Sequence, residues 1–152
     1  MEQVITKIRK NASSEIWVVL SDYTGALRLD LREYFRAEDG VFRPTRKGVG
    51  IDPDGISSLV DGLDMLTETS QPGTVAVVAR RTGAEILAGV REYQGHTYCE
   101  IRQFVADATG GWKPTGKGVT FKAGLIPALM EAVEKAETLF RSPHDERRPE
   151  PR

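Results

Sequence analysis

The chain has 152 residues, a formal net charge of −1, 39% hydrophobic residues and 28% charged residues. This composition is typical of a folded globular protein and excludes a disordered chain. No apolar run approaches the roughly 18 residues that cross a bilayer, and the single cysteine, Cys99, excludes an internal disulfide and a cysteine-based zinc site. The N-terminus lacks a basic-then-apolar signal layout, so we expect a mature, cytoplasmic protein.

The first half of the chain predicts four strands and a helix. The β-branched stretch 4–10 and the apolar stretch 16–22 predict two strands. A third strand follows the turn at 23–25, because leucines alternate there with charged residues: Leu27, Leu29 and Leu31 against Arg28, Asp30 and Arg32. The turn at 38–40 leads into a fourth strand that ends near Ile51. Asp52 then predicts a helix N-cap with proline at the first helical position, and apolar residues follow at helical spacing: Ile56, Leu59, Val60, Leu63 and Leu66.

The second half repeats this order. Residues 74–80 and 86–92 predict two strands, and a third has Thr97, Cys99 and Ile101 on its inward face. A fourth strand ends near Phe121, and a helix over 125–140 tolerates Pro127 in its first turn. The charged, proline-containing residues from Ser142 onward have no apolar period and predict disorder.

The two halves are copies of each other. At an offset of 70 residues, 13 of 52 positions between Glu15 and Leu66 are identical to those between Glu85 and Ala136. The longest match sets residues 44–49 against 114–119. We therefore predict a first unit over 1–66, a linker over 67–73, a second unit over 74–140 and a disordered tail over 141–152. Because one small unit buries little core alone, we expect an α+β fold whose two four-strand-plus-helix units pack as a pseudo-twofold intramolecular dimer.

Enzymatic functions fit the sequence poorly. His96 and His144 are the only histidines, and neither lies near a nucleophile and a carboxylate in sequence. The glycines around Lys47 and Lys117 lack the spacing of a phosphate-binding loop. Cys99 falls on the inward face of a strand, as a small core residue would. We predict no enzyme activity, no cofactor and no metal site.

The fourth strands are basic although the chain is near neutral. Residues 40–50 carry three positive charges and residues 110–120 carry two, with no negative charge in either stretch. The acidic residues gather in the helices instead. One face of the molecule is therefore predicted to be basic and to attract polyanions.

The order of these motifs resembles the family of the transcriptional coactivator positive cofactor four. The resemblance rests on the runs 22–25, 29–35 and 43–49, with Gly40 between them, and on their counterparts 93–96 and 111–119, which look like bacterial members. It covers roughly residues 4–66 and 74–140. The family implies curved sheets, helix-mediated dimers and single-stranded DNA held across the two sheets, and bacterial membership implies a place at the nucleoid. The matching positions, with Arg91 added, are Tyr23, Arg32, Phe35, Arg43, Arg46, Lys47, Arg91, Tyr93, Arg102, Lys113 and Lys117.

Cations and flat rings are what a single strand needs, because its phosphates are charged and its bases are unstacked. Strict alternation places Arg32 and Phe35 on opposite faces, so both contact one ligand only if a bulge intervenes near Glu33. Tyr23 and Tyr93 could instead only finish their hairpins, and Phe42 and Trp112 are predicted to pack in the core. The second copy has Val105 and Gly116 in place of Phe35 and Arg46, which predicts weaker binding there.

The predicted function is binding of single-stranded DNA without sequence preference, as a coactivator-like or DNA-metabolism factor. One alternative is a protein-interaction module of the transcription machinery with little affinity for nucleic acid. A second is RNA binding on the same surface. Further homo-oligomerisation beyond the internal pair stays open.

Overall fold

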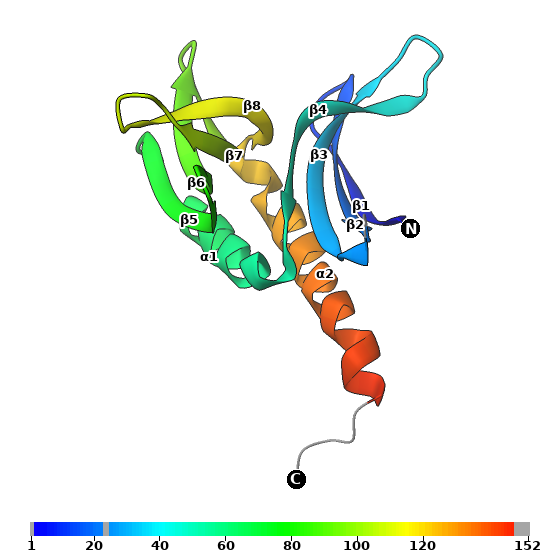
Figure 1. Cartoon of the computed structure of the whole chain (residues 1–152). Helices are drawn as coiled ribbons and strands as arrows, with labels where there is room; N and C mark the ends of the chain where they lie inside the picture. Colours follow the sequence, from blue (N-terminus) through cyan, green and yellow to red (C-terminus); the bar gives the residue numbers. More distant parts are fainter. Residues whose placement is uncertain (1, 23–24, 148–152) are drawn as a thin grey trace.

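The computed structural model describes residues 2–22 and 25–147, and the side chains of these ranges up to residue 140. It contains two four-stranded antiparallel sheets with their strands in sequence order (Figure 1). The first sheet is β1 (Glu2–Arg9), β2 (Ser14–Ser21), β3 (Arg28–Arg36) and β4 (Phe42–Ile51). The second is β5 (Gly73–Arg81), β6 (Ala84–Tyr93), β7 (His96–Ala106) and β8 (Trp112–Phe121). The 3₁₀ turns η2 (Pro53–Gly55) and η3 (Ala123–Leu125) lead into helices α1 (Ile56–Leu66) and α2 (Ile126–Arg147), which confirms the predicted fold class.

Alternating side chains give each sheet one buried face. Leu29 and Leu31 on β3 are fully buried, while the intervening Asp30 and its neighbour Arg32 lie on the open face and are only half-buried. Leu27 was predicted to point inward with them, but it is exposed, because it precedes Arg28, the first residue of β3 that pairs with β2. The buried faces of both sheets and both helices form one continuous apolar cluster.

The helices are exchanged between the units. Helix α1 packs on β5 and β6 of the second sheet, α2 packs on β1 and β2 of the first, and the two helices contact each other (Figure 1). Only residues 67–72 separate the end of α1 from the start of β5, a short connection that fits the packing of α1 on the second sheet. This arrangement supplies each sheet with a cover, and it brings β4 and β8 into contact between the two sheets.

The helix ends add detail to two predictions. Asp52 occupies the N-cap position of η2, but its side chain makes no capping hydrogen bond and pairs with Arg28 instead, with Nε to Oδ1 at 3.1 Å. Helix α2 continues to Arg147, whereas residues from 141 onward were predicted to be disordered. Once its packed turns are formed, a helix extends at the cost of one residue's dihedrals per added hydrogen bond. Residues 148–152 lie outside the described part.

Gly62 marks the closest approach of α1 to the second sheet. A Cβ built on it would lie 3.1 Å from the Cβ of Ala88 and 3.5 Å from the Cβ of Ala76. We expect Gly62→Leu to lower the free energy of unfolding by about 1–3 kcal/mol through overpacking, whereas Asp61→Leu on the exposed side of the same helix changes it little.

Two single-tryptophan variants show whether the loss of stability is shared by both sheets. Trp17 lies on β2 and Trp112 on β8, so Trp112→Phe leaves a reporter in the first sheet and Trp17→Phe leaves one in the second. Urea unfolding followed by tryptophan fluorescence should show the same loss from Gly62→Leu with either reporter. Two separate transitions would contradict the shared core.

Candidate nucleic-acid interface

A bulge in the fourth strand of each sheet shapes the open face. Arg32 pairs with Gly48 and Tyr34 pairs with Pro44, so residues 45–47 of β4 lie opposite Glu33 alone. In the second sheet, residues 115–117 of β8 lie opposite Gln103 in the same way. A bulge is therefore present opposite Glu33, but its extra residues belong to β4. Strand β3 stays in regular register with β2 from Arg28 to Phe35, so Phe35 remains on the face opposite Arg32.

A threonine fixes each bulge to the neighbouring strand. Thr45 Oγ1 donates to the Glu33 carbonyl at 2.7 Å and accepts from the Lys47 amide at 3.1 Å. Thr115 does the same with the Gln103 carbonyl and the Lys117 amide, at 3.0 and 3.1 Å. These bonds leave the side chains of Lys47 and Lys117 exposed at the outer edge of each bulge.

Arg32 and Arg102 brace the bulges and are already bonded within the protein. Arg32 Nη1 donates to the Thr45 carbonyl at 2.9 Å, and Nε and Nη2 donate to the Asp30 carboxylate at 2.9 and 3.0 Å. Arg102 donates to the carbonyl of Thr115 at 2.8 Å and to Glu100 at 2.7 Å. Their side chains are 26% and 11% exposed. Both residues were predicted to contact nucleic acid, and the structure places them mainly within the sheets.

Gly48 leaves space for the side chain of Arg32, which bonds the bulge of β4. A Cβ at this position would lie 2.5 Å from Cζ of Arg32, a separation that atoms do not adopt, so only glycine lets the guanidinium cross β4. At the equivalent Gly118 a Cβ would lie 2.8 Å from Cα of Arg102. The two glycines therefore contribute to the same contacts as Arg32 and Arg102, because a side chain at either position would clash with the arginine beside it.

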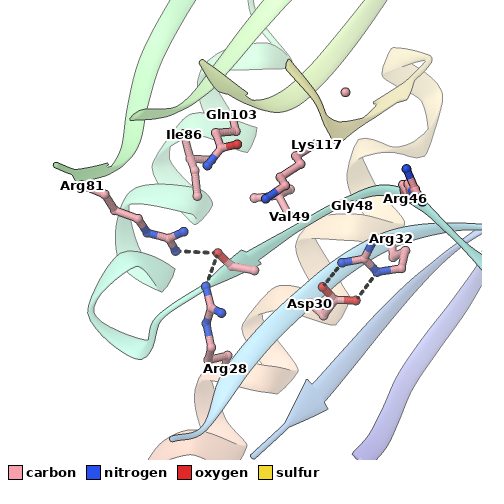
Figure 2. A pocket seen from close by; sticks show the side chains of 12 residues that line it. Arg28, Asp30, Arg32, Arg46, Gly48, Val49, Arg81, Ile86, Gln103 and Lys117 are labelled. Carbon is pink, nitrogen blue, oxygen red and sulfur yellow. Dashed lines mark hydrogen bonds and ion pairs between the residues drawn. The ribbon is translucent and has the colours of Figure 1, made fainter. Parts of the chain in front are cut away.

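Two clefts lie between the units, at pseudo-equivalent places. We name the first the arginine cleft; it is lined by Arg28, Asp30, Arg32, Arg46, Gly48, Val49, Gly50, Arg81, Ile86, Gln103, Gly116 and Lys117. Figure 2 shows Arg28, Arg32 and Arg46 from the first unit on one side, with Arg81, Gln103 and Lys117 from the second unit on the other. The cleft brings together the predicted residues Arg32, Arg46 and Lys117.

The arginine cleft is tied across the unit boundary. The Gly50 carbonyl accepts from Arg28 Nη2 at 3.2 Å and from Arg81 Nη2 at 2.8 Å; Figure 2 shows the dashed lines that leave the labelled Arg28 and Arg81. The Asp52 carboxylate pairs with Arg28 at 3.1 Å and lies 4.0 Å from Arg81. We name these four residues, Arg28, Gly50, Asp52 and Arg81, the clasp.

The second cleft, named here the tyrosine cleft, is lined by Lys10, Asn11, Lys47, Arg91, Tyr93, Tyr98, Thr120, Phe121, Lys122 and Leu125. It gathers the predicted residues Lys47, Arg91 and Tyr93 from both units. No carboxylate is among its described lining residues. Behind the lining, Glu33 pairs with Lys10 at 3.2 Å and Glu100 pairs with Arg91 at 3.4 Å. The Lys122 ammonium lies 5.7 Å from the ring centroid of Tyr98.

The remaining predicted residues lie elsewhere. Phe35, Arg43 and Lys113 are exposed near the β3–β4 and β7–β8 hairpins, away from both clefts. The Arg43 guanidinium bonds both oxygens of Asp39, and this contact, with the Val41 amide, holds the pKa of the Asp39 carboxyl below its usual value. Trp112, predicted as a core residue, is 45% exposed, and Phe42 is half-buried. Tyr23 lies outside the described residues.

Several residues at the clefts were missed from the sequence. Lys10 and Arg81 lie at the first turn of each unit, where the repeat is weak, and Lys122 follows the basic stretch of β8. Arg28 and Tyr98 occupy the same position of the repeat, on the polar side of the third strand. This shared position was the sequence signal that could have identified them as surface residues of the site. Trp17 and Tyr34 were also missed; their rings stack at 3.8 Å on the open face of the first sheet, with the Lys7 ammonium 4.2 Å from the indole.

Other kinds of site are not evident in the described part of the chain. No group of histidine, cysteine or acidic side chains there could hold a metal ion. Cys99 is buried, and burial raises the pKa of its thiol, so the thiolate that a nucleophile needs is disfavoured. No described helix is long and apolar enough to cross a membrane.

Comparison with known proteins agrees with this architecture. The sequence model of PC4, the transcriptional coactivator p15, matches residues 10–62 and again residues 81–132, more than half of the chain. The chain therefore belongs to the PC4 family and carries its domain twice.

Two solved structures are similar to parts of the chain. One is a PC4 homolog from Burkholderia pseudomallei, with 25% identity, a TM-score of 0.40, and 45% of this chain and 92% of that chain covered. The other is the bacteriophage T5 homolog of the eukaryotic coactivator PC4, implicated in recombination-dependent DNA replication, with 21% identity, a TM-score of 0.37, and 50% and 92% covered. No curated protein sequence matches the chain.

The bonds that Arg102 makes to the Thr115 carbonyl and to Glu100 indicate a role for this residue in stability. We expect Arg102→Ala to lower the free energy of unfolding by about 1–3 kcal/mol, because it leaves the half-buried Thr115 carbonyl and the buried Glu100 with fewer partners. Lys113→Ala, an exposed neighbour on β8, should change it by less than about 0.5 kcal/mol. Urea denaturation followed by circular dichroism measures both, and equal small losses would show that the brace is dispensable.

Proposed function

We propose that the chain binds single-stranded DNA without sequence preference, between its two sheets. The observation that carries this proposal is the tyrosine cleft, where Lys47 of the first unit faces Arg91, Tyr93 and Tyr98 of the second. Cations can neutralise the phosphates, and exposed rings can stack on unpaired bases of any identity. A duplex offers no unstacked bases, so the same surface favours single strands.

Family membership supports the same function. The PC4 domain is that of a transcriptional coactivator, and the phage relative is implicated in DNA replication. The chain would then act in the cytoplasm, at the nucleoid, on strands exposed during transcription, replication or repair.

The test is fluorescence anisotropy with a labelled mixed-sequence DNA strand of about 20 nucleotides, long enough to cover the site of one or two domains. We expect binding that weakens steeply between low and moderate salt, because each neutralised phosphate releases counterions. An unlabelled duplex should compete poorly. Absence of binding at low salt would overturn the proposal and favour a protein-interaction module, and tighter binding to RNA of the same sequence would favour the RNA alternative.

Tyr93 offers a direct test of base stacking. Its side chain is 59% exposed, so truncation should leave the fold intact. We expect Tyr93→Ala to weaken binding by about 5- to 150-fold, the loss of one stacked base at about 1–3 kcal/mol. Tyr93→Phe keeps the ring and should bind within about twofold of the unaltered chain. If the two variants bind alike, the tyrosine does not stack on a base.

A further inference from the structure

The two clefts differ at four pseudo-equivalent positions. Tyr98 in the tyrosine cleft corresponds to Arg28 in the arginine cleft, and Lys122 corresponds to Asp52. Likewise, Thr120 corresponds to Gly50, and the strand register makes Lys10 the counterpart of Arg81. These are the four residues of the clasp, so the tyrosine cleft has a neutral or cationic residue wherever the arginine cleft has a clasp member.

The clasp holds both of its arginines in contacts within the protein. Arg28 and Arg81 come from different units, and both donate to one carbonyl and lie within 4.0 Å of one carboxylate. Arg32 is likewise held by Asp30. A phosphate that binds Arg28 or Arg32 in this cleft competes with the carboxylate of Asp52 or Asp30 that is already bonded to that guanidinium.

The cations of the tyrosine cleft are available. Lys47 and Lys122 are exposed and have no ion-pair partner among the residues that the structure describes. Glu33 and Glu100, which pair with Lys10 and Arg91, are themselves buried and lie behind the lining. A phosphate can therefore approach two free ammonium groups from opposite units without breaking an existing pair.

We propose that a DNA strand occupies the tyrosine cleft alone, and that the clasp closes the arginine cleft to nucleic acid. This inference rests on the proposed function and names which of two similar surfaces performs it. The pseudo-twofold chain then has one binding site where a symmetric pair of units would have two. Arg46 and Lys117 also line the arginine cleft and have no ion-pair partner among the described residues; in this proposal they attract the polyanion without holding it in the cleft.

Stoichiometry tests the inference. An oligothymidine of about eight nucleotides, near the site size of one small domain, is titrated into the full chain at a protein concentration well above the dissociation constant. We expect saturation at one oligonucleotide per chain. Saturation at two would overturn the single site, whereas no binding at all would overturn the proposed function itself.

The salt dependence of DNA binding tests whether the strand occupies the tyrosine cleft. Lys122→Gln removes one proposed phosphate contact, and it should reduce the slope of log K against log salt by about 0.7. Lys135→Gln makes the same charge change at an exposed position of α2 and should leave the slope unchanged. Equal slopes for the two variants would show that the strand does not contact Lys122.

Removing the shared carboxylate of the clasp tests whether the clasp excludes nucleic acid from the arginine cleft. Asp52→Asn removes the carboxylate shared by Arg28 and Arg81, and it should raise the stoichiometry from one oligonucleotide to two. Asp54 lies in the 3₁₀ turn that follows Asp52 and has no ion pair among the described residues; Asp54→Asn makes the same charge change and should leave the value at one. Unaltered stoichiometry in Asp52→Asn, with a native circular dichroism spectrum, would overturn the role of the clasp.

Discussion

Each helix of this chain buries its apolar face on the sheet of the other unit, and every feature of the open surface follows from that exchange. A four-stranded sheet with one apolar face needs a cover, and the short connection after Leu66 leaves α1 beside β5 and β6. With the helices crossed beneath, β4 and β8 meet between the sheets. The basic bulges on these two strands are thereby brought to the boundary between the units, where side chains from both halves of the sequence line common clefts.

Much of the fold was predictable because its signals are local. Alternation identified Leu29 and Leu31 as buried, and the apolar spacing from Ile56 to Leu66 identified α1. The repeat then extended each assignment to the second unit. Local signals failed at the ends of elements: Leu27 alternates correctly but precedes the paired part of β3, and Asp52 has the identity of a capping residue but forms an ion pair with an arginine 24 residues earlier.

The site was predictable only in part, since it depends on contacts between distant residues. Lys47, Arg91 and Tyr93 were identified individually, but nothing in their spacing indicates that they line one cleft with Lys10 and Lys122. Arg32 presents a different difficulty. Its position on the open face favoured a ligand contact, yet Asp30, two residues earlier on the same face, satisfies its guanidinium. A carboxylate at that spacing on a strand competes directly for the cation, and the ligand contact of Arg32 stays a prediction.

The connection over residues 67–72 has a consequence for how the two units stay together. Because it joins them covalently, each unit meets the other at an effective concentration in the millimolar range, whatever the concentration of the chain. Dilution therefore cannot separate the pair, and no association step precedes ligand binding. The joined units also need not stay alike: a substitution in one copy is not repeated in its partner, which is how the same position can hold a carboxylate at one cleft and an ammonium at the other.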